Sequence, residues 1–295
     1  MKSVLKYKKN PRLILLGLDR LKIITLNDRE YINLIYYEKF NKYPNLDQPN
    51  SFDEKLQWLK LNERKDIYTT LVDKYLVKEY IKNTIGEEFL IPTIGIYDKF
   101  EEINFDNLPN QFVIKCTHDS GGLVICRDKS KLDIKNTRKK INASLKNDYY
   151  RTWREWPYKN VKRRILIEKY METNTGELED YKFYCFDGKV DYVMYCFNRN
   201  KNNTKFYYYD KDWNLIRNFS YDGMKAEKNI EKPQNLDKMY EIAKKLSKGM
   251  KFVRVDLYNI NGKIYFGELT FFPSAGLDNT RKKEANDYLN SMLKI

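Results

Sequence analysis

The sequence predicts an α+β fold that combines antiparallel strand hairpins with separate helices. The strongest signal lies at 252–276, FVRVDLYNINGKIYFGELTFFPSAG, where two runs rich in β-branched and aromatic residues flank an Asn-Gly pair. Asn-Gly between alternating apolar residues is typical of a β-hairpin with a two-residue turn. A compact apolar run at 111–116, QFVIKC, predicts a further strand, whereas residues 236–248 are typical of a helix.

The N-terminal part of the chain is predicted to be mainly helical. An aromatic-rich segment at 31–40 has helical character. Ser51 and Glu54 have the spacing of a capping box, in which two side chains satisfy backbone N–H groups at the start of a helix. A further helix is expected at 68–83. Residues 1–88 are therefore interpreted as an N-terminal helical region.

A glycine-rich turn, THDSGG at 117–122, joins the strand at 111–116 to the strand-like run LVICRD. Because no helix follows this turn, it is neither a Walker motif nor a Rossmann fingerprint. Lys115 lies in the middle of the buried strand, where a lysine is costly unless its amine meets an anion. The turn is either a flap whose backbone N–H groups close over phosphate oxygens or an ordinary tight turn.

The connector at 151–164, RTWREWPYKNVKRR, interleaves aromatic and basic residues. It follows helix-like sequence at 135–150 and precedes the apolar strand ILIEKYME at 165–172. Aromatic rings beside cations can form a platform for a sugar or an anion. A solvated linker is the equally open alternative.

The hairpin at 252–276 places two carboxylates close together. Asp256 lies about six residues before the turn centre and Glu268 about six after it, so near-symmetric pairing brings their side chains to neighbouring positions. Arg254 and Thr270 point to the same face, because side chains alternate along a strand. Oxygen ligands beside a fixed positive charge suit a Mg²⁺–phosphate complex. The alternative is an exposed strand face whose charges pair with each other.

The composition favours anionic partners. The chain has 295 residues and a formal net charge of +14. No pattern typical of a nucleic-acid-binding module accompanies the charge, so no nucleic-acid partner is expected. No apolar run approaches the roughly 20 residues that span a bilayer. We therefore expect a cytoplasmic protein without a membrane span.

Cysteine and histidine usage excludes several kinds of site. The four cysteines form no Cys-x-x-Cys pair, and His118 is the single histidine. This argues against structural zinc and against a disulfide framework. Cys116 lies two residues before His118, but a Cys–His nucleophile is disfavoured because no further catalytic signature accompanies the pair.

Several short motifs together resemble a known superfamily. They are Asp73-Lys74, FVIKC with its Ser-Gly-Gly turn, ILIEKY, RVD and FGEL, in this order. This order resembles the ATP-grasp superfamily, and LQWLKL, LVDKY, REWPYKN and DYKFYCFDGK resemble its TupA-like branch. The likeness covers about 52–276. It implies an α+β ATP-grasp fold in which an N-lobe with the lid (89–167) and a C-lobe with the adenine hinge and metal site (168–295) clamp ATP.

The resemblance assigns residues to nucleotide binding. By similarity to the D-alanine:D-alanine ligases, Lys74 and Lys115 contact the ATP phosphates, and the Ser-Gly-Gly turn is the mobile lid. Glu168 and Lys169 match the hinge beside the adenine, and Asp180 matches an acid that binds the ribose. The complete set is Lys74, Lys115, Ser120, Gly121, Gly122, Glu168, Lys169, Asp180 and Lys182.

The resemblance also assigns the metal and the catalytic groups. Asp256 and Glu268 match the Mg²⁺ ligands, and Thr270 occupies the position of a third metal residue that is usually asparagine. Arg254 matches an arginine that steadies the acyl phosphate, and Lys115 shares the catalytic assignment. The implied cofactors are ATP and Mg²⁺.

The implied activity is that of an ADP-forming carboxylate–amine ligase, which joins an amino acid to a uronic-acid carboxylate of a capsular or cell-wall polysaccharide or its precursor. Expected partners are ATP, an acidic glycan or sugar carboxylate and an amino-acid amine, and peripheral association with membrane-bound biosynthetic machinery is left open. Asp210-Lys-Asp212 leaves a glycosyltransferase as an alternative, although it also fits a hairpin turn. A non-catalytic module for anionic ligands is the third interpretation.

Replacement of Lys115 by alanine tests the assignment of its amine. If the amine is a phosphate ligand, Lys115→Ala should lose most of the ATP affinity while the protein still folds. Titration calorimetry measures the affinity, and circular dichroism checks the fold. Unchanged nucleotide affinity in the folded variant would contradict the assignment.

Overall fold

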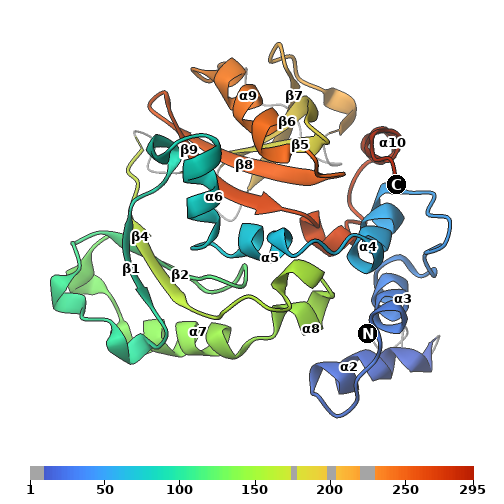
Figure 1. Ribbon diagram of the computed structural model, residues 1–295, viewed down its shortest axis with the longest axis horizontal. Helices are drawn as coiled ribbons and strands as arrows, with labels where there is room; N and C mark the ends of the chain where they lie inside the picture. Colours follow the sequence, from blue (N-terminus) through green and yellow to red (C-terminus); the bar gives the residue numbers. More distant parts are fainter. Residues whose placement is uncertain (1–9, 174–177, 198–203, 220–229) are drawn as a thin grey trace.

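The computed structural model describes residues 10–173, 178–197, 204–219 and 230–295 (Figure 1). Its strands form two antiparallel sheets. The first has the order β1-β4-β2-β3 and the second β7-β6-β5-β8-β9. The strands are β1 (Thr93–Tyr97), β2 (Phe112–Cys116), β3 (Leu123–Cys126), β4 (Ile165–Lys169), β5 (Asp180–Phe186), β6 (Lys189–Phe197), β7 (Lys205–Asp210), β8 (Val253–Ile260) and β9 (Lys263–Thr270).

Helices surround the two sheets, and the N-terminal helices lie beside the C-terminal segment (Figure 1). Helix α9 contacts β5, β6 and β8, and α7 contacts β2. The α-helices are α2 (Ile14–Arg20), α3 (Asp28–Phe40), α4 (Phe52–Asn62), α5 (Ile67–Val72), α6 (Val77–Thr84), α7 (Ile134–Lys146), α8 (Tyr149–Trp153), α9 (Leu236–Ser247) and α10 (Lys283–Met292).

The predicted helix at 68–83 is wrong as a single element, because the chain breaks between α5 and α6. The side chain of Asp73 accepts hydrogen bonds from the backbone N–H groups of Tyr75 (2.8 Å) and Leu76 (3.1 Å). Such local bonds offer the backbone an alternative to helical pairing. Lys74 therefore lies in the break. The predicted helix at 135–150 divides in the same way, into α7 and α8.

A β-bulge shifts the register of the C-terminal hairpin. Near the turn, Tyr258 pairs with Tyr265, but Asp256 pairs with Glu268. Gly267 is the extra residue of β9 at this shift. A Cβ atom on Gly267 would lie 2.9 Å from the backbone oxygen of Asp256. The two carboxylates are therefore opposite each other, as the sequence predicts, but only because glycine allows the strands to approach closely.

The connector at 151–164 joins the N-terminal helices to the rest of the molecule. Arg154 is 3% exposed, its Nη2 lies 2.9 Å from Oδ2 of Asp19, and its guanidinium lies 3.9 Å from the ring centre of Tyr31. Arg151 Nε lies 3.2 Å from Oδ1 of Asp19. These two arginines therefore serve packing, and a sugar platform built on them is wrong.

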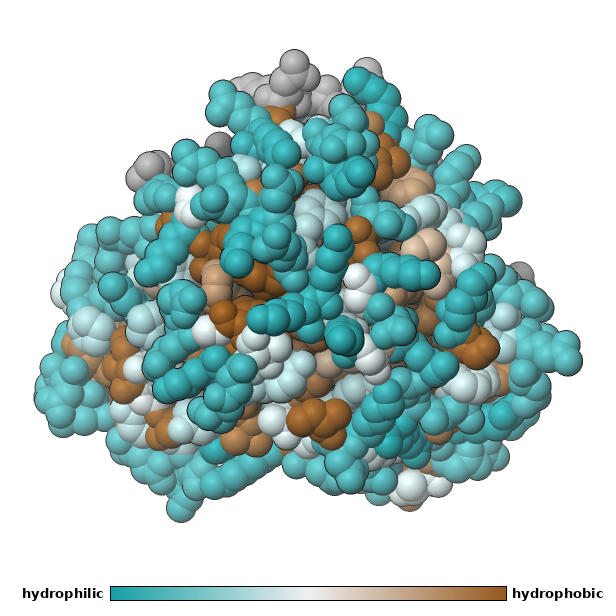
Figure 2. All heavy atoms as spheres, turned by 45° about the horizontal axis from the view of Figure 1, so that its top comes forward, coloured by the Kyte–Doolittle hydropathy of each residue, from teal (hydrophilic) through white to brown (hydrophobic). Residues whose placement is uncertain are grey.

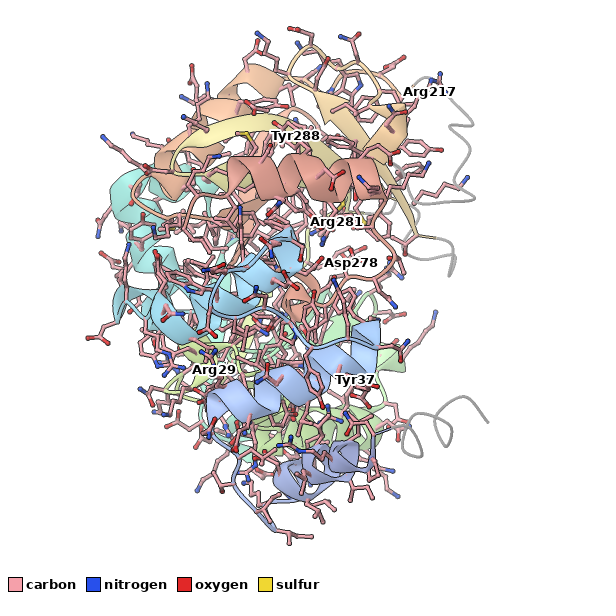
Figure 3. The ribbon with its side chains drawn as sticks, turned by 90° about the vertical axis from the view of Figure 1, so that its right-hand side faces the viewer. Arg29, Tyr37, Arg217, Asp278, Arg281 and Tyr288 are labelled. Atoms are coloured by element: carbon pink, nitrogen blue, oxygen red, sulfur yellow. The ribbon has the colours of Figure 1, made fainter. Side chains whose placement is uncertain are left out.

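The C-terminal segment packs against the N-terminal helices. Arg281 and Asp278 lie between α10 and the blue N-terminal helices in Figure 3. Nη1 of Arg281 lies 2.9 Å from Oδ2 of Asp53 at the start of α4. Hydrophilic side chains cover most of the face shown in Figure 2, with hydrophobic ones in small separate groups. Within the described ranges, no helix is both long and apolar enough to cross a lipid bilayer.

The bulge can be tested with a pair of glycine substitutions. Gly267→Ala should lower the free energy of unfolding by roughly 1–3 kcal/mol, because the added Cβ overpacks the hairpin. Gly17→Ala is the matched control, since nothing lies within 4 Å of the added Cβ and the residue is in α2. That change should stabilise by about 0.5–1 kcal/mol. Urea unfolding measures both, and equal effects would contradict the role of the bulge.

Candidate active site

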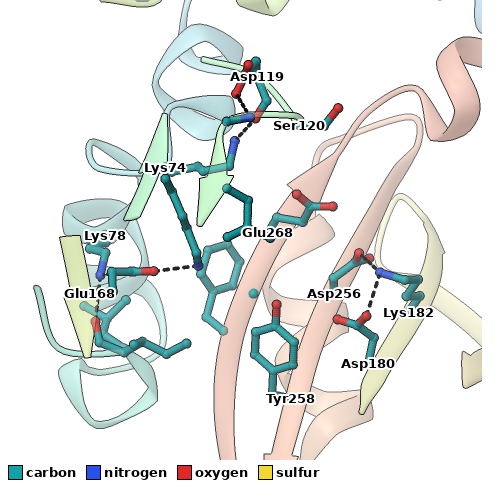
Figure 4. Close-up of a pocket in the computed structure, with 17 residues that line it drawn as sticks. Lys74, Lys78, Asp119, Ser120, Glu168, Asp180, Lys182, Asp256, Tyr258 and Glu268 are labelled. Carbon is teal, nitrogen blue, oxygen red and sulfur yellow. Dashed lines mark hydrogen bonds and ion pairs between the residues drawn. The ribbon is translucent and has the colours of Figure 1, made fainter. Parts of the chain in front are cut away.

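A cavity of about 230 Å³ is lined by both sheets (Figure 4). Most of the site residues predicted from the sequence line it. They are Lys74, Lys115, Ser120, Gly122, Glu168, Asp180, Lys182, Asp256 and Glu268. Gly121 and Lys169 are exposed and, like Arg254 and Thr270, are not lining residues. The structure therefore gathers residues that are distant in sequence into one site.

One side of the cavity carries most of the lysines. Lys115 Nζ lies 2.6 Å from Oε2 of Glu168, and Lys78 forms an ion pair with the other oxygen of the same carboxylate. Burial alone would raise the pKa of Glu168, but Lys115 and Lys78 hold it below its ordinary value. We call Lys74, Lys78 and Lys115 the lysine wall. Three lysines face two carboxylates, Glu168 and Asp119, on this side of the cavity, so the net charge of the wall favours an anionic ligand.

Lys74 connects this wall to the glycine-rich turn. Its backbone N–H donates to the carbonyl of Thr117 at 3.2 Å, and its amine donates to the carbonyl of Asp119. Burial lowers the pKa of Lys74. Asp119 also accepts the backbone N–H of Gly122 at 3.1 Å. The base of the turn is therefore anchored, whereas Ser120 at its tip is exposed.

The opposite side of the cavity carries carboxylates. Asp256 is 2% exposed and forms an ion pair with Lys182, its direct neighbour on β5. The guanidinium of Arg254 donates to both oxygens of Asp256, each at 2.7 Å. Asp180 lies on the same side, where its carboxylate is 3.7 Å from the amine of Lys182. We call Asp180, Asp256 and Glu268 the carboxylate wall.

Glu268 completes this wall on β9. Its Oε1 lies 3.3 Å from Nη2 of Arg254 and accepts the hydroxyl of Thr270 at 3.1 Å. Glu268 is 46% exposed, and its partial desolvation by the surrounding protein opposes ionisation. The positive charges of Lys182, Arg254 and Lys74 outweigh this effect and lower the pKa of Glu268 to about 2. Glu268 is therefore a carboxylate at neutral pH.

The donor set fits a Mg²⁺ ion that would take its remaining ligands from a nucleotide. Asp256 and Glu268 are hard oxygen donors on paired positions, which suits Mg²⁺. In the part of the chain described, no three His, Cys, Asp or Glu side chains cluster tightly enough to hold a metal by themselves. Mg²⁺ usually binds through one or two carboxylates together with substrate phosphates and water. Thr270, which donates to Glu268, orients that carboxylate.

The cavity also has apolar lining residues that the sequence did not single out. They are Leu90, Ile91, Leu123, Tyr258 and Phe266. Period-2 alternation could have found Tyr258, which lies two residues from Asp256 on the same strand. It could not have found Phe266, because the bulge at Gly267 interrupts the alternation between that residue and Glu268. Leu90 and Ile91 precede β1 and had no such signal.

The alternative sites in the sequence are structural. Oδ1 of Asp210 accepts the backbone N–H groups of Asp212 (2.9 Å) and Asn214 (2.8 Å), so this segment is the polar turn after β7. Neither aspartate lines the cavity. Cys116 is buried, and burial raises its pKa to about 11. Nε2 of His118 lies 3.2 Å from the carbonyl of Ser144. A Cys–His nucleophile is therefore disfavoured further.

Comparison with protein families shows which family the chain belongs to. The family model described as TupA-like ATPgrasp matches residues 54–294. The chain belongs to the TupA-like ATP-grasp family. This membership confirms the predicted ATP-grasp superfamily, its TupA-like branch and the α+β ATP-grasp fold, and it agrees with the predicted class of ATP-grasp ligase. No curated protein showed a significant match to the chain.

Solved ATP-grasp structures show distant likenesses to this TupA-like protein. D-Alanine–D-alanine ligase from Bacillus anthracis complexed with ATP is 19% identical over 68% of this chain and 54% of the ligase, with a TM-score of 0.41. The D-alanine–D-alanine ligase from Helicobacter pylori is 15% identical over 83% of this chain and 70% of the ligase, with a TM-score of 0.41. D-Cycloserine synthetase DcsG is 11% identical over 77% of this chain and 70% of the synthetase, with a TM-score of 0.42. The chain thus spans about half the length of the first ligase.

A pair of carboxylate-to-amide changes in this TupA-like protein tests the electrostatics of the wall. Asp256→Asn removes the buried charge that Lys182 and Arg254 share, so the free energy of unfolding should fall by about 3–5 kcal/mol. Glu268→Gln is the matched control, because its side chain is 46% exposed. Its effect should stay within about 1 kcal/mol. Urea unfolding measures both values, and a small loss for Asp256→Asn would contradict the buried ion-pair network.

Proposed function

We propose that the protein is an ATP- and Mg²⁺-dependent carboxylate–amine ligase that forms an amide through an acyl phosphate. The supporting observation is the division of charge across one cavity. The lysine wall suits the phosphates of a nucleotide, and the carboxylate wall suits a divalent cation (Figure 4). A free anion would complement the charge of the lysine wall alone, and a free cation that of the carboxylate wall alone. A magnesium–nucleotide complex satisfies both.

The proposed reaction has two steps. A substrate carboxylate oxygen attacks the γ-phosphorus of ATP, the bond to the bridging oxygen breaks, and ADP leaves. The amine nitrogen then attacks the carbonyl carbon of the acyl phosphate. Inorganic phosphate leaves with its bonding electron pair, and the nitrogen loses a proton. The two substrates supply both nucleophiles, so the protein needs no activated serine or cysteine.

The residues of the chain contribute alignment and charge. Lys74 and Lys115 would bind phosphate oxygens. Arg254 does not line the cavity and donates to Asp256, so its positive charge would steady the transferred group electrostatically and not by direct contact. Asp256 and Glu268 would hold Mg²⁺, which supplies charge neutralisation when bound. Apolar lining residues, Ile91 among them, would contact the base.

The proposed carboxylate is that of a uronic acid in a surface polysaccharide or its precursor, and the proposed amine is an amino acid. The resemblance to the TupA-like branch supports this, because that branch is associated with acidic cell-wall and capsular polymers. The net charge of +14 favours an acidic substrate but does not select among acids.

Dependence of ADP release on both substrates tests the proposal. With ATP and Mg²⁺, a pool of uronic acids and a pool of amino acids together should release ADP, and either pool alone should release far less. Hydroxylamine in place of amino acids should yield a hydroxamate, because it attacks the acyl phosphate. ADP release that needs no carboxylate would contradict the ligase. Release of UDP from a sugar nucleotide would favour the glycosyltransferase.

A further inference from the structure

Three apolar side chains protrude from the N-terminal helical region. Leu21 is 72% exposed, Ile23 65% and Ile14 54%, which makes them the most exposed large apolar side chains in the described part of the chain. They lie within ten residues of each other, and the family match begins only at residue 54. These side chains therefore belong to a part of the molecule that the ATP-grasp assignment leaves unexplained.

Hydrogen bonds define the turn that presents Leu21 and Ile23. At the end of α2, the backbone N–H of Ile23 donates to the carbonyl of Leu18 at 3.0 Å, and that of Lys22 donates to Asp19 at 2.8 Å. Lys22 has a φ of 62°. This is a Schellman motif, in which the left-handed position is usually glycine and the following residue usually packs against the helix. Here that following residue, Ile23, is exposed.

The other face of α2 is anchored to the molecule. Leu13 and Leu16 are buried in a cluster with Tyr31. Asp19 is fully buried and holds the side chain of Arg154 from the connector. Helix α2 is therefore fixed on this side and lies at the edge of the molecule in Figure 1. The three protruding side chains are attached to an anchored part of the structure.

Positively charged residues flank the protruding side chains in the sequence. Arg12 and Lys22 are exposed beside them. Within the described part of this segment, residues 10–26 contain three cations, Arg12, Arg20 and Lys22, and a single acid, Asp19. Since Asp19 is buried and paired, it does not offset the exposed cations. The surface therefore combines apolar side chains with a local excess of positive charge.

We propose that Ile14, Leu21 and Ile23 dock on an anionic lipid surface, with Arg12 and Lys22 against the headgroups. A few apolar side chains on a basic segment suffice for interfacial binding, which depends on apolar insertion and attraction to anionic lipid together. A stable protein interface usually buries at least about 1,200 Å², more than a turn and a short helix offer. Charged residues are also depleted at the centre of protein interfaces.

Sedimentation of the full chain with lipid vesicles tests the proposal. The protein should bind vesicles of phosphatidylcholine with phosphatidylglycerol, and not vesicles of phosphatidylcholine alone. The double variant Leu21→Glu/Ile23→Glu should bind at least roughly tenfold more weakly, because it loses both apolar insertions. Raised salt should weaken binding of the unaltered protein. Absence of binding to the anionic vesicles would overturn the proposal.

A matched control distinguishes the loss of this particular surface from a general loss of exposed apolar side chains. Ile134→Glu/Ile295→Glu changes two exposed isoleucines elsewhere and should retain full vesicle binding. ATP affinity should be unchanged in both double variants, which shows that they are folded. Equal loss of binding in the two variants would overturn the proposal. So would a concentration-dependent dimer in sedimentation velocity that Leu21→Glu/Ile23→Glu abolishes, because a second copy would then cover this surface.

Discussion

The buried carboxylate of Asp256 is the interaction on which the site depends. It lies between Lys182 on β5 and Arg254 on its own strand, and β9 brings Glu268 to the opposite position. A buried charge is tolerated only when partners satisfy it. The pairing of three neighbouring strands therefore keeps the carboxylate wall charged, and the bulge at Gly267 allows both carboxylates to occupy it.

The two walls come from different parts of the fold, and this separation shapes the function. Lys115 belongs to the first sheet, whereas Lys182 and the carboxylates belong to the second. The break that contains Lys74 ties the N-terminal helices to the glycine-rich turn. A ligand that touches both walls therefore contacts both sheets. Binding of such a ligand should stabilise the folded protein through mass action.

Local sequence patterns predicted the hairpin and half of the capping box, because turn and cap chemistry acts over a few residues. Oγ of Ser51 accepts the backbone N–H of Glu54 at 3.3 Å, whereas the Glu54 carboxylate accepts that of Asn50 at 2.9 Å. They missed the break at Asp73, where side-chain bonding to nearby N–H groups overrides a helical window. The bulge was also missed, since near-symmetric counting pairs the carboxylates without revealing the extra residue Gly267. The burial of Arg154 against Asp19 joins segments 135 residues apart, which no local pattern encodes.

Magnesium dependence of nucleotide binding tests the central claim most directly. Titration calorimetry would compare ADP binding with and without Mg²⁺ in the unaltered protein and in Glu268→Gln. This variant should still fold, because the side chain of Glu268 is 46% exposed. The account predicts that Mg²⁺ tightens binding in the unaltered protein and that Glu268→Gln loses most of this gain while it keeps its metal-free affinity. The same Mg²⁺ gain in both proteins would contradict the metal site.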